Sequence, residues 1–465
     1  MPFVLGVDSS AHATTVELRD VDSGELFGEG ASRYTDAESR AAEQDPLMWW
    51  NALVDARRDA GGALGVNAVA VAAQTPGLVL LDGDAQVIRP AVLRADPDVA
   101  RIADSLVGAL GGREAWTEAS GSVPDASFSV ARLAWLRRAE PDEFARIAKV
   151  MSPHDWLTFR LSRKIVTDRG DASTTGFFSP REGEWRPELL GLVDPDKSWG
   201  PCLPRVLDAS AAAGDREGVT IAAGTGSTMA AALGVALRPR DVLVSFEHGT
   251  VFSLRERATE DVTGRVAGLA DATGRFLPTV RSSDALSLLE AFAGVLGVDA
   301  SRFDRLALEA PPGARGVTLM PAEPQQPGRP ARPGVLTGFD VGASPSLIAR
   351  AAVEGVAHRV LDDIDALRQA DVPVGGRLVI LGGARSHALS QVLADLSRRP
   401  VALPKGDRVV AGACVLGAAA LHGAPPGDIA TAWRLDRARE LEPNPSADAE
   451  ELRAAYKRAA ADRKA

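Results

Sequence analysis

The chain has 465 residues, of which 45% are apolar and 25% charged, and its formal net charge is −10. A single hydrophobic core does not grow to this size, so the length predicts two domains of about 200 residues. The acidic balance argues against a nucleic-acid binder. Two cysteines far apart in sequence, Cys202 and Cys414, support neither a disulfide framework nor a zinc cluster. With no basic leader and no long apolar run, we expect a cytoplasmic protein without a membrane span.

The first half alternates strand and helix patterns. Residues 3–8 form an apolar strand that ends at Asp8, and residues 16–19 form a return strand after a polar turn. Residues 68–72 and 78–81 predict buried strands, and residues 167–175 a polar loop. Helices are expected at residues 47–60, 96–110, 130–138, 142–150 and 152–161.

The centre of the chain has a strand, a glycine-rich turn and a small-residue helix. Residues 219–223 predict the strand, and Gly224-Thr225-Gly226 interrupts it. Ser227 and Thr228 are good N-cap residues for an Ala/Leu-rich helix over 229–237. Two strands are expected next, at 242–246 and 250–254. A helix of small residues lets a neighbouring layer approach closely, so we expect it at a junction.

The second half repeats this alternation. Ser344 and Pro345 predict the start of a long amphipathic helix that ends at residue 367. Residues 311–334 are rich in Pro and Gly and predict a surface loop. The remaining elements are expected at residues 285–295 (helix), 377–381 (strand), 387–397 (helix), 410–422 (helix) and 447–465 (helix). Since a strand hairpin opens each half, the chain is interpreted as an internal duplication.

Several short motifs follow one another along nearly the whole chain in a specific order and spacing. They resemble the motifs of the FGGY carbohydrate kinases, most closely of the xylulokinase branch. The motifs are Gly6-Val7-Asp8-Ser9-Ser10, Glu43-Gln44-Asp45-Pro46 with Trp49-Trp50, Ile88-Arg89-Pro90-Ala91, Pro153-His154-Asp155-Trp156-Leu157, Thr167-Asp168 with Asp171-Ala172-Ser173, Gly224-Thr225-Gly226 and Gly382-Gly383-Ala384-Arg385-Ser386.

The resemblance implies an α/β fold with two actin-like (ribonuclease H-like) ATPase domains and a cleft between them. On this basis, residues 1–240 are expected to form the sugar-side domain and residues 241–425 the nucleotide-side domain. Residues 426–465 are expected to form a helical tail that packs back on the first domain. The family reaction moves the γ-phosphoryl group of Mg-ATP to a sugar hydroxyl, such as that of D-xylulose. The expected partners are a sugar, a nucleotide and a second subunit, either an identical copy or a paralogue, with no nucleic acid and no membrane.

The catalytic motifs depart from the family pattern. The position of the family's general-base Asp holds Ser227. A serine hydroxyl cannot act as a base near neutral pH unless a partner first removes its proton. Asp8 is kept, where the family uses it to hold metal and phosphates. The second phosphate hairpin carries Glu247 and His248 and is one residue shorter than usual.

The resemblance also assigns ligand contacts. Gln74 and Asp96 remain on the sugar side, where a histidine and a tryptophan of the family pattern are absent. The expected nucleotide contacts are Ser10, Thr14, Gly249, Thr250, Gly382, Gly383, Ala384 and Arg385.

Three functions are compatible with these departures. The first, which the sequence favours, is a xylulokinase-like homologue with weak or no catalysis that binds a ligand or a partner subunit. The second is an active sugar kinase with an atypical substrate and a displaced base, Asp8 or Asp96. The third is a non-catalytic partner subunit of an active paralogue.

Overall fold

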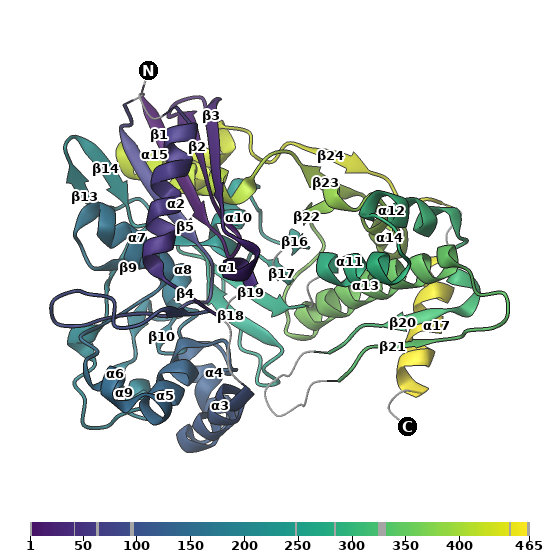
Figure 1. The fold of residues 1–465 in the computed structure, drawn as a ribbon, viewed down its shortest axis with the longest axis horizontal. Helices are drawn as coiled ribbons and strands as arrows, with labels where there is room; N and C mark the ends of the chain where they lie inside the picture. The colour runs from purple at the N-terminus through teal and green to yellow at the C-terminus, as the bar shows by residue number, and fades with distance from the viewer. Residues whose placement is uncertain are drawn as a thin grey trace. The chain divides into compact units, whose positions relative to one another are not determined.

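The computed structural model describes residues 2–40, 42–61, 65–93, 97–246, 249–282, 285–323, 332–445 and 448–462. Contacts within the chain divide it into two compact units, both of which are discontinuous in sequence (Figure 1). The first unit comprises Met1–Leu237, Glu256–Leu277 and Gly406–Arg437. The second comprises Arg238–Arg255, Pro278–Lys405 and Ala438–Ala465.

The first unit is built on a mixed sheet whose central strands are buried. β1 (Phe3–Ser9) runs antiparallel to β2 (Ala13–Asp20) and parallel to β5 (Ala68–Ala73). Every residue of β5 is buried, which suits its small and β-branched side chains. The strand order is β13-β14-β5-β1-β2-β3, and the flanking strands are β3 (Leu26–Arg33), β14 (Val219–Ala222) and β13 (Ala212–Arg216).

The second sheet repeats this pattern. β16 (Val242–Ser245) runs antiparallel to β17 (Thr250–Ser253) and parallel to β22 (Leu378–Leu381). In both sheets a hairpin lies beside a later parallel strand, which is the arrangement that the predicted duplication requires. The full order is β18-β19-β17-β16-β22-β23-β24, with β18 (Val266–Ala270), β19 (Phe276–Arg281), β23 (Val401–Pro404) and β24 (Ala438–Leu441).

Two small-residue helices pack closely on the first sheet. α15 (Arg408–His422) lies against β1 and β5, although it is remote from them in sequence (Figure 1). It also packs against α10 (Ser227–Gly234) at glycine contacts. A Cβ on Gly412 would lie 1.9 Å from the carbonyl oxygen of Ala230, so only glycine permits this approach. The expected close packing of the central helix is therefore confirmed.

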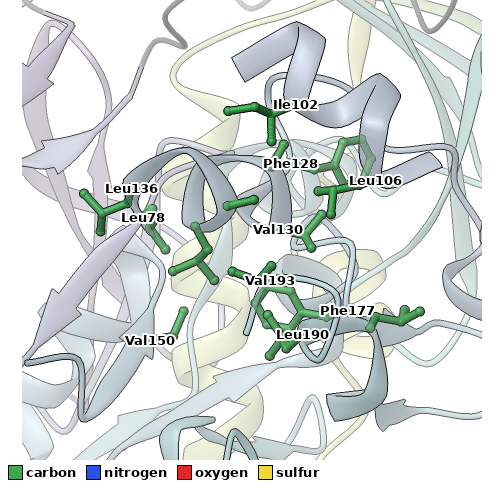
Figure 2. Packing of buried hydrophobic residues seen from close by; sticks show 14 of the residues in the cluster. Leu78, Ile102, Leu106, Phe128, Val130, Leu136, Val150, Phe177, Leu190 and Val193 are labelled. Carbon is green, nitrogen blue, oxygen red and sulfur yellow. The ribbon is translucent and has the colours of Figure 1, made fainter. Parts of the chain in front are cut away.

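A second hydrophobic core lies in the same unit, away from the sheet. α5 (Ser129–Ala139) and α3 (Pro97–Leu110) direct apolar side chains toward Phe177, which is fully buried. Figure 2 shows this cluster, with labels on Leu78, Ile102, Leu106, Phe128, Val130, Leu136, Val150, Phe177, Leu190 and Val193. This core holds the helices that follow β5 without using the face of the sheet.

Three local predictions differ from the structure. The expected helix over 142–150 is a short helix, α6 (Pro141–Ala145), followed by β8 (Lys149–Met151), because residues 149–151 pair with β6 (Val79–Leu81). The expected loop over 167–175 contains β9 (Val166–Asp168) and α8 (Arg169–Ala172), a turn of helix that Asp168 caps. In the expected loop over 311–334, β20 (Thr318–Met320) pairs with β21 (Val335–Thr337).

Most helix predictions are confirmed within a few residues. Ser344 caps α13 (Pro345–Gln369) as expected. The other helices are α1 (Asp36–Arg40), α2 (Pro46–Asp59), α4 (Arg113–Ser120), α7 (Pro153–Ser162), α9 (Pro187–Leu190), α11 (Ala285–Val295), α12 (Ala300–Glu309), α14 (His387–Ser397), α16 (Pro426–Ala432) and α17 (Ala449–Asp462). The remaining short strands are β4 (Glu43–Gln44), β7 (Ala91–Val92), β10 (Phe178–Ser179), β11 (Glu184–Trp185), β12 (Arg205–Leu207) and β15 (Thr225–Gly226).

The C-terminal tail divides between the two units. α16 packs on α15 and α10 of the first unit, whereas α17 packs on α13 and α14 of the second. On α17, the Tyr456 ring stacks on His358 of α13 at 4.4 Å, and Arg453 pairs with Asp362 at 2.6 Å. The expectation that the terminal helix returns to the first domain is therefore wrong for α17, because its aromatic and basic side chains find partners on α13.

Among the helices that the structure describes, no single one is long and apolar enough to cross a membrane. α15 and α16 pass such a test only when they are taken together, and they are bent by 116°.

Candidate active-site residues

Asp8 and Ser227 meet at the carboxyl end of the first sheet. Asp8 lies on β1 opposite Thr15 of β2 and Ala72 of β5. β15 pairs with the end of β5, and this pairing brings the first residue of α10 beside β1. The Ser227 hydroxyl donates a hydrogen bond to Asp8 Oδ1 at 2.9 Å. Both side chains are buried, with 3% of Ser227 and 6% of Asp8 exposed.

The capping role predicted for Ser227 is wrong. The N-cap of α10 is Gly226, with extended backbone angles and no side-chain cap, and Ser227 is the first helical residue. A serine at the N-cap would have used its hydroxyl on the backbone of the first turn. Because Ser227 lies one position after the N-cap, its hydroxyl donates its hydrogen bond to the Asp8 carboxylate instead.

The hydroxyls of the first hairpin are satisfied within the protein. Ser10 Oγ donates to the Ala13 carbonyl at 2.9 Å and accepts from the backbone amides of His12 and Ala13, so it closes the turn. Thr14 is fully buried on β2, and its hydroxyl is bonded to the Tyr34 hydroxyl at 2.9 Å. The structure therefore directs Thr14 into the protein, and the two amides that could cradle a phosphate already have a partner.

Gln74 follows β5 and belongs to an amide network at the same edge. Its Nε2 donates to Gln44 Oε1 at 3.2 Å, and its backbone amide donates to the Ser9 carbonyl at 2.9 Å. Gln44 also donates to the Ala11 carbonyl at 3.1 Å, in the first hairpin. Gln44 therefore links Gln74, a predicted sugar contact, to the turn of the first hairpin, a predicted phosphate contact.

A fully buried histidine lies beneath these turns, among three aspartates. His154 is the second residue of α7, whose N-cap Ser152 and N3 residue Asp155 form a capping box. His154 Nδ1 lies 2.6 Å from Asp171 Oδ2, and Nε2 lies 3.1 Å from Asp155 Oδ1 and 3.8 Å from Asp168 Oδ1. The three carboxylates lie within 4 Å of the ring, and His154 and the three aspartates are each no more than 3% exposed.

The electrostatics of this cluster follow from its three carboxylates. Burial alone would lower the pKa of His154, but the charges of Asp155 and Asp171 raise it to about 9. Burial raises the pKa of Asp155 to about 6, against the opposing effect of His154. Burial also raises the pKa of Asp168. The raised pKa favours the imidazolium form of His154, whose charge offsets part of the carboxylate charge.

The second unit contains the other predicted phosphate hairpin. Gly249 has a positive φ of 56° and directly precedes the return strand β17. The hydroxyl of Thr250 is buried and has no hydrogen-bond partner among the residues that the structure describes. An oxygen of a ligand or a water would satisfy this atom. Glu247, His248 and the sugar-side Asp96 lie outside the described residues.

The turn after β22 is a strand-to-helix connection with its own internal bonds. Gly382 has a φ of 76°, and a Cβ on Gly383 would lie 2.7 Å from the Leu403 side chain. Ser386 caps α14 and donates to Asp304 at 2.7 Å. Arg385 forms an exposed ion pair with Glu290 at 3.0 Å. Ala384 lies in the same turn. Packing explains the glycines of this motif, which leaves their role in nucleotide binding a prediction.

These residues fit Mg-ATP only in part. Within the described residues, no group of three or more His, Cys, Asp or Glu side chains is arranged to hold a metal ion. Asp8 offers a buried carboxylate that could contact a metal, and Thr250 offers an unpartnered hydroxyl. The hydroxyls of Ser10 and Thr14, by contrast, are used inside the first unit.

Two units with the same hairpin-and-parallel-strand sheet, each carrying a hydroxyl-bearing turn at the hairpin, match solved sugar kinases with the actin-like ATPase fold. The model of the FGGY family N-terminal domain matches residues 3–234, and that of the C-terminal domain matches residues 220–421. The chain belongs to the FGGY family of carbohydrate kinases.

Individual relatives agree with this assignment. A xylulose kinase of Streptomyces rubiginosus is 36% identical over 456 residues, which are 95% of this chain and 92% of that protein. The crystal structure of a xylulose kinase from Bifidobacterium adolescentis covers 99% of both chains, with 29% identity and a TM-score of 0.82. A structure from Brucella ovis, described as a xyloylose kinase, covers 99% of this chain and 98% of its own, with 27% identity and a TM-score of 0.87. Within the family, the chain is therefore similar to the xylulose kinases.

Sequence reasoning missed several residues of the site. Tyr34 holds Thr14, and Thr75 Oγ1 donates to Asp171 Oδ1 at 3.2 Å. Tyr34 lies in no motif, although it is one of only two tyrosines in the chain, and Thr75 directly follows the predicted sugar contact Gln74. Gln44 and His154 do lie in the quoted motifs, but their partners come from segments remote in sequence. Only the folded chain shows what they hold.

Proposed function

We propose that this chain is a xylulokinase-like member of the family that binds sugar and nucleotide but phosphorylates a ketopentose slowly or not at all. The observation that carries the proposal is the hydrogen bond from the Ser227 hydroxyl to Asp8 at 2.9 Å. At the position of the family's general base, this chain has a hydrogen-bond donor in place of a proton acceptor.

The chemical consequence is a slower proton transfer. A general base contributes about 10²–10⁴ to the rate when its pKa is matched to the reaction. A buried serine would have to lose its own proton first, and its nearest acceptor, Asp8, already holds that proton in a hydrogen bond. The internally bonded turn of Ser10 supports the same proposal, because fewer donors are available to orient the transferring phosphoryl group.

A second candidate is an active kinase in which Asp8 replaces the missing base. The Ser227–Asp8 hydrogen bond also supports this candidate, because it places the Asp8 carboxylate 2.9 Å from the hydroxyl that occupies the usual position of the base. In that case Asp8 would accept the sugar proton, and Ser227 would orient it. The other candidate base, Asp96, lies outside the described residues.

One experiment separates the two candidates. The purified protein is given Mg-ATP and D-xylulose in a coupled assay, and binding of each ligand is titrated separately. Binding with turnover far below roughly 1–100 per second supports the proposal, since that is the usual range for kinases. Turnover within that range that Asp8→Asn abolishes, and that the exposed control Asp55→Asn leaves intact, identifies Asp8 as the base.

The remaining parts of the functional assignment are also proposals. We place the protein in the cytoplasm, as a homodimer or as the partner of a paralogue, and assign a Mg²⁺ contact to Asp8. On the nucleotide side, the proposed contacts are Thr250 and the turn of Gly382 and Gly383, and on the sugar side Gln74. Light scattering of the purified protein, alone and mixed with a paralogue, tests the oligomeric state.

A further inference from the structure

The three aspartates around His154 have oxygens that bond to other parts of the chain. Asp171 contacts His154 through Oδ2, and its Oδ1 accepts a hydrogen bond from Thr75 Oγ1 at 3.2 Å. Asp168 faces the ring through Oδ1, and its Oδ2 accepts from Thr225 Oγ1 at 2.8 Å. Two carboxylates therefore each bridge the histidine to a threonine hydroxyl.

The two threonines lie in the turns that carry the candidate ligand residues. Thr75 directly follows Gln74, and Thr225 precedes Ser227 by two positions. The turns also contact each other, because a Cβ on Gly226 would lie 2.3 Å from Thr75 Oγ1 and 3.2 Å from Asp171 Oδ1. A displacement of either carboxylate would therefore move both turns.

The charge of the ring is needed to hold this arrangement. Like charges that lie close together in a buried site repel strongly, because the effective dielectric constant there is far below that of water. The charged groups that face His154 are Asp155 on its own helix, Asp168 at the end of β9 and Asp171 on α8. Without the imidazolium, the carboxylates would move apart, and a displacement of Asp171 or Asp168 would weaken the hydrogen bonds that they accept from Thr75 and Thr225.

We propose that His154 is a positioning residue that, through Asp171 and Asp168, fixes the Thr75 and Thr225 turns and thereby the positions of Gln74 and Ser227, which these turns carry. Its role in sugar binding rests on the proposed function, but its role in fixing the two turns does not. The residue acts through its neighbours and contacts no ligand itself.

A purely structural role predicts a different response. If His154 only stabilised the core, its loss would loosen the first unit evenly. A positioning role predicts a local effect at residues 74–77 and 224–228, with the strands of the sheet unchanged. The threonines supply matched variants. Thr75→Val removes the hydrogen bond to Asp171, Thr225→Val removes the hydrogen bond to Asp168, and both leave the charges in place.

Hydrogen exchange of the ligand-free full chain tests the proposal. In His154→Gln we expect exchange at residues 74–77 and 224–228 to rise at least tenfold, with β5 and the second unit unchanged. His154→Lys, which keeps the positive charge, should remain within about threefold of the wild type. Thr75→Val and Thr225→Val should each loosen their own turn, and these two variants test the proposal if His154→Gln does not fold.

Two results would overturn the proposal: an even rise in exchange across the first unit, or unchanged turns in all the variants. A His154→Lys protein that behaves like His154→Gln would also overturn it, because the charge would then be irrelevant. Titration of D-xylulose against the same proteins should show at least tenfold weaker binding in His154→Gln. If the wild type binds no D-xylulose while the local exchange effect is present, the proposed function fails and the positioning role stands.

Discussion

The Ser227 hydroxyl and the Asp8 carboxylate form a buried hydrogen bond of 2.9 Å between residues that lie 219 positions apart. The bond joins the end of the first strand to the first turn of the central helix. A donor and an acceptor satisfy each other there without a ligand. An Asp at position 227 would instead place two carboxylates together.

Replacing Ser227 by Ala should destabilise the protein by about 1–3 kcal/mol, because Asp8 would lose a hydrogen bond made to a charged group. Urea unfolding at pH 7 measures this free energy. Ser397→Ala serves as the control, since Ser397 is partly exposed at the end of α14 and bonds only to its own helix. Equal effects of the two substitutions would show that the Asp8 contact contributes nothing to stability.

Replacing Ser227 by Asp should not restore phosphoryl transfer by itself. The new carboxylate would lie beside Asp8 in a buried site, where like charges raise the pKa of one partner and lower stability. The backbone amides of His12 and Ala13 would also remain hydrogen-bonded to the Ser10 hydroxyl, so they would not be available to a phosphate. In the coupled assay with D-xylulose, Ser227→Asp should be less than tenfold faster than the wild type. The same assay is then run on a variant that combines Ser227→Asp with a rebuilt Gly-Thr-Ser-Gly hairpin at 246–249. Turnover near roughly 1–100 per second in the single variant would contradict this expectation.

The stability of the wild type should fall as pH rises from about 6 to 9. The pKa of His154 is raised from 6.5 to about 9 in the folded state, so its contribution is complete below pH 6.5 and is lost as pH passes 9. The pKa of Asp155 is raised to about 6, so it too favours folding at low pH and loses that effect as pH rises through 6. The expected loss is of the order of a few kcal/mol, at about 1.4 kcal/mol per unit of pKa shift.

Urea unfolding at pH 6, 7.5 and 9 measures this dependence in the wild type and in His154→Gln. The variant should lose the part of the slope that lies above pH 6.5. Parallel pH profiles for the two proteins would mean that His154 does not titrate in this range.

Replacing Gly412 by Ala should destabilise the first unit by about 2–4 kcal/mol. The new methyl group would lie 1.9 Å from the Ala230 carbonyl oxygen, so α15 and α10 would have to separate. Gly108→Ala is a matched control, because Gly108 lies in helix α3 with nothing within 4 Å of its Cβ position. That substitution should be neutral or stabilising by up to about 1 kcal/mol. A Gly412→Ala protein as stable as the control would mean that the two helices do not pack as closely as described.

Local sequence determined much of the secondary structure. Ser344 with Pro345 marks a helix start that the structure confirms, because a cap depends on residues within one turn, and the helix expected over 152–161 is observed as α7. The apolar strands at residues 3–8 and 68–72 are also confirmed, since burial on both faces requires a continuous apolar run. Where pairing with a distant segment competes with local preference, prediction failed, as at residues 149–151, which pair with β6 instead of extending a helix.

The order and spacing of the motifs were enough to place the chain in its family, because they reflect a fold that many short segments specify together. The sequence also showed that position 227 holds a serine. What that serine does was decided by tertiary structure: β15 pairs with β5 and brings position 227 beside Asp8, so the hydroxyl donates to a carboxylate instead of capping its own helix. The partners of His154 were decided in the same way, because three carboxylates from α7, α8 and β9 become neighbours of one ring only when the first unit folds and excludes water.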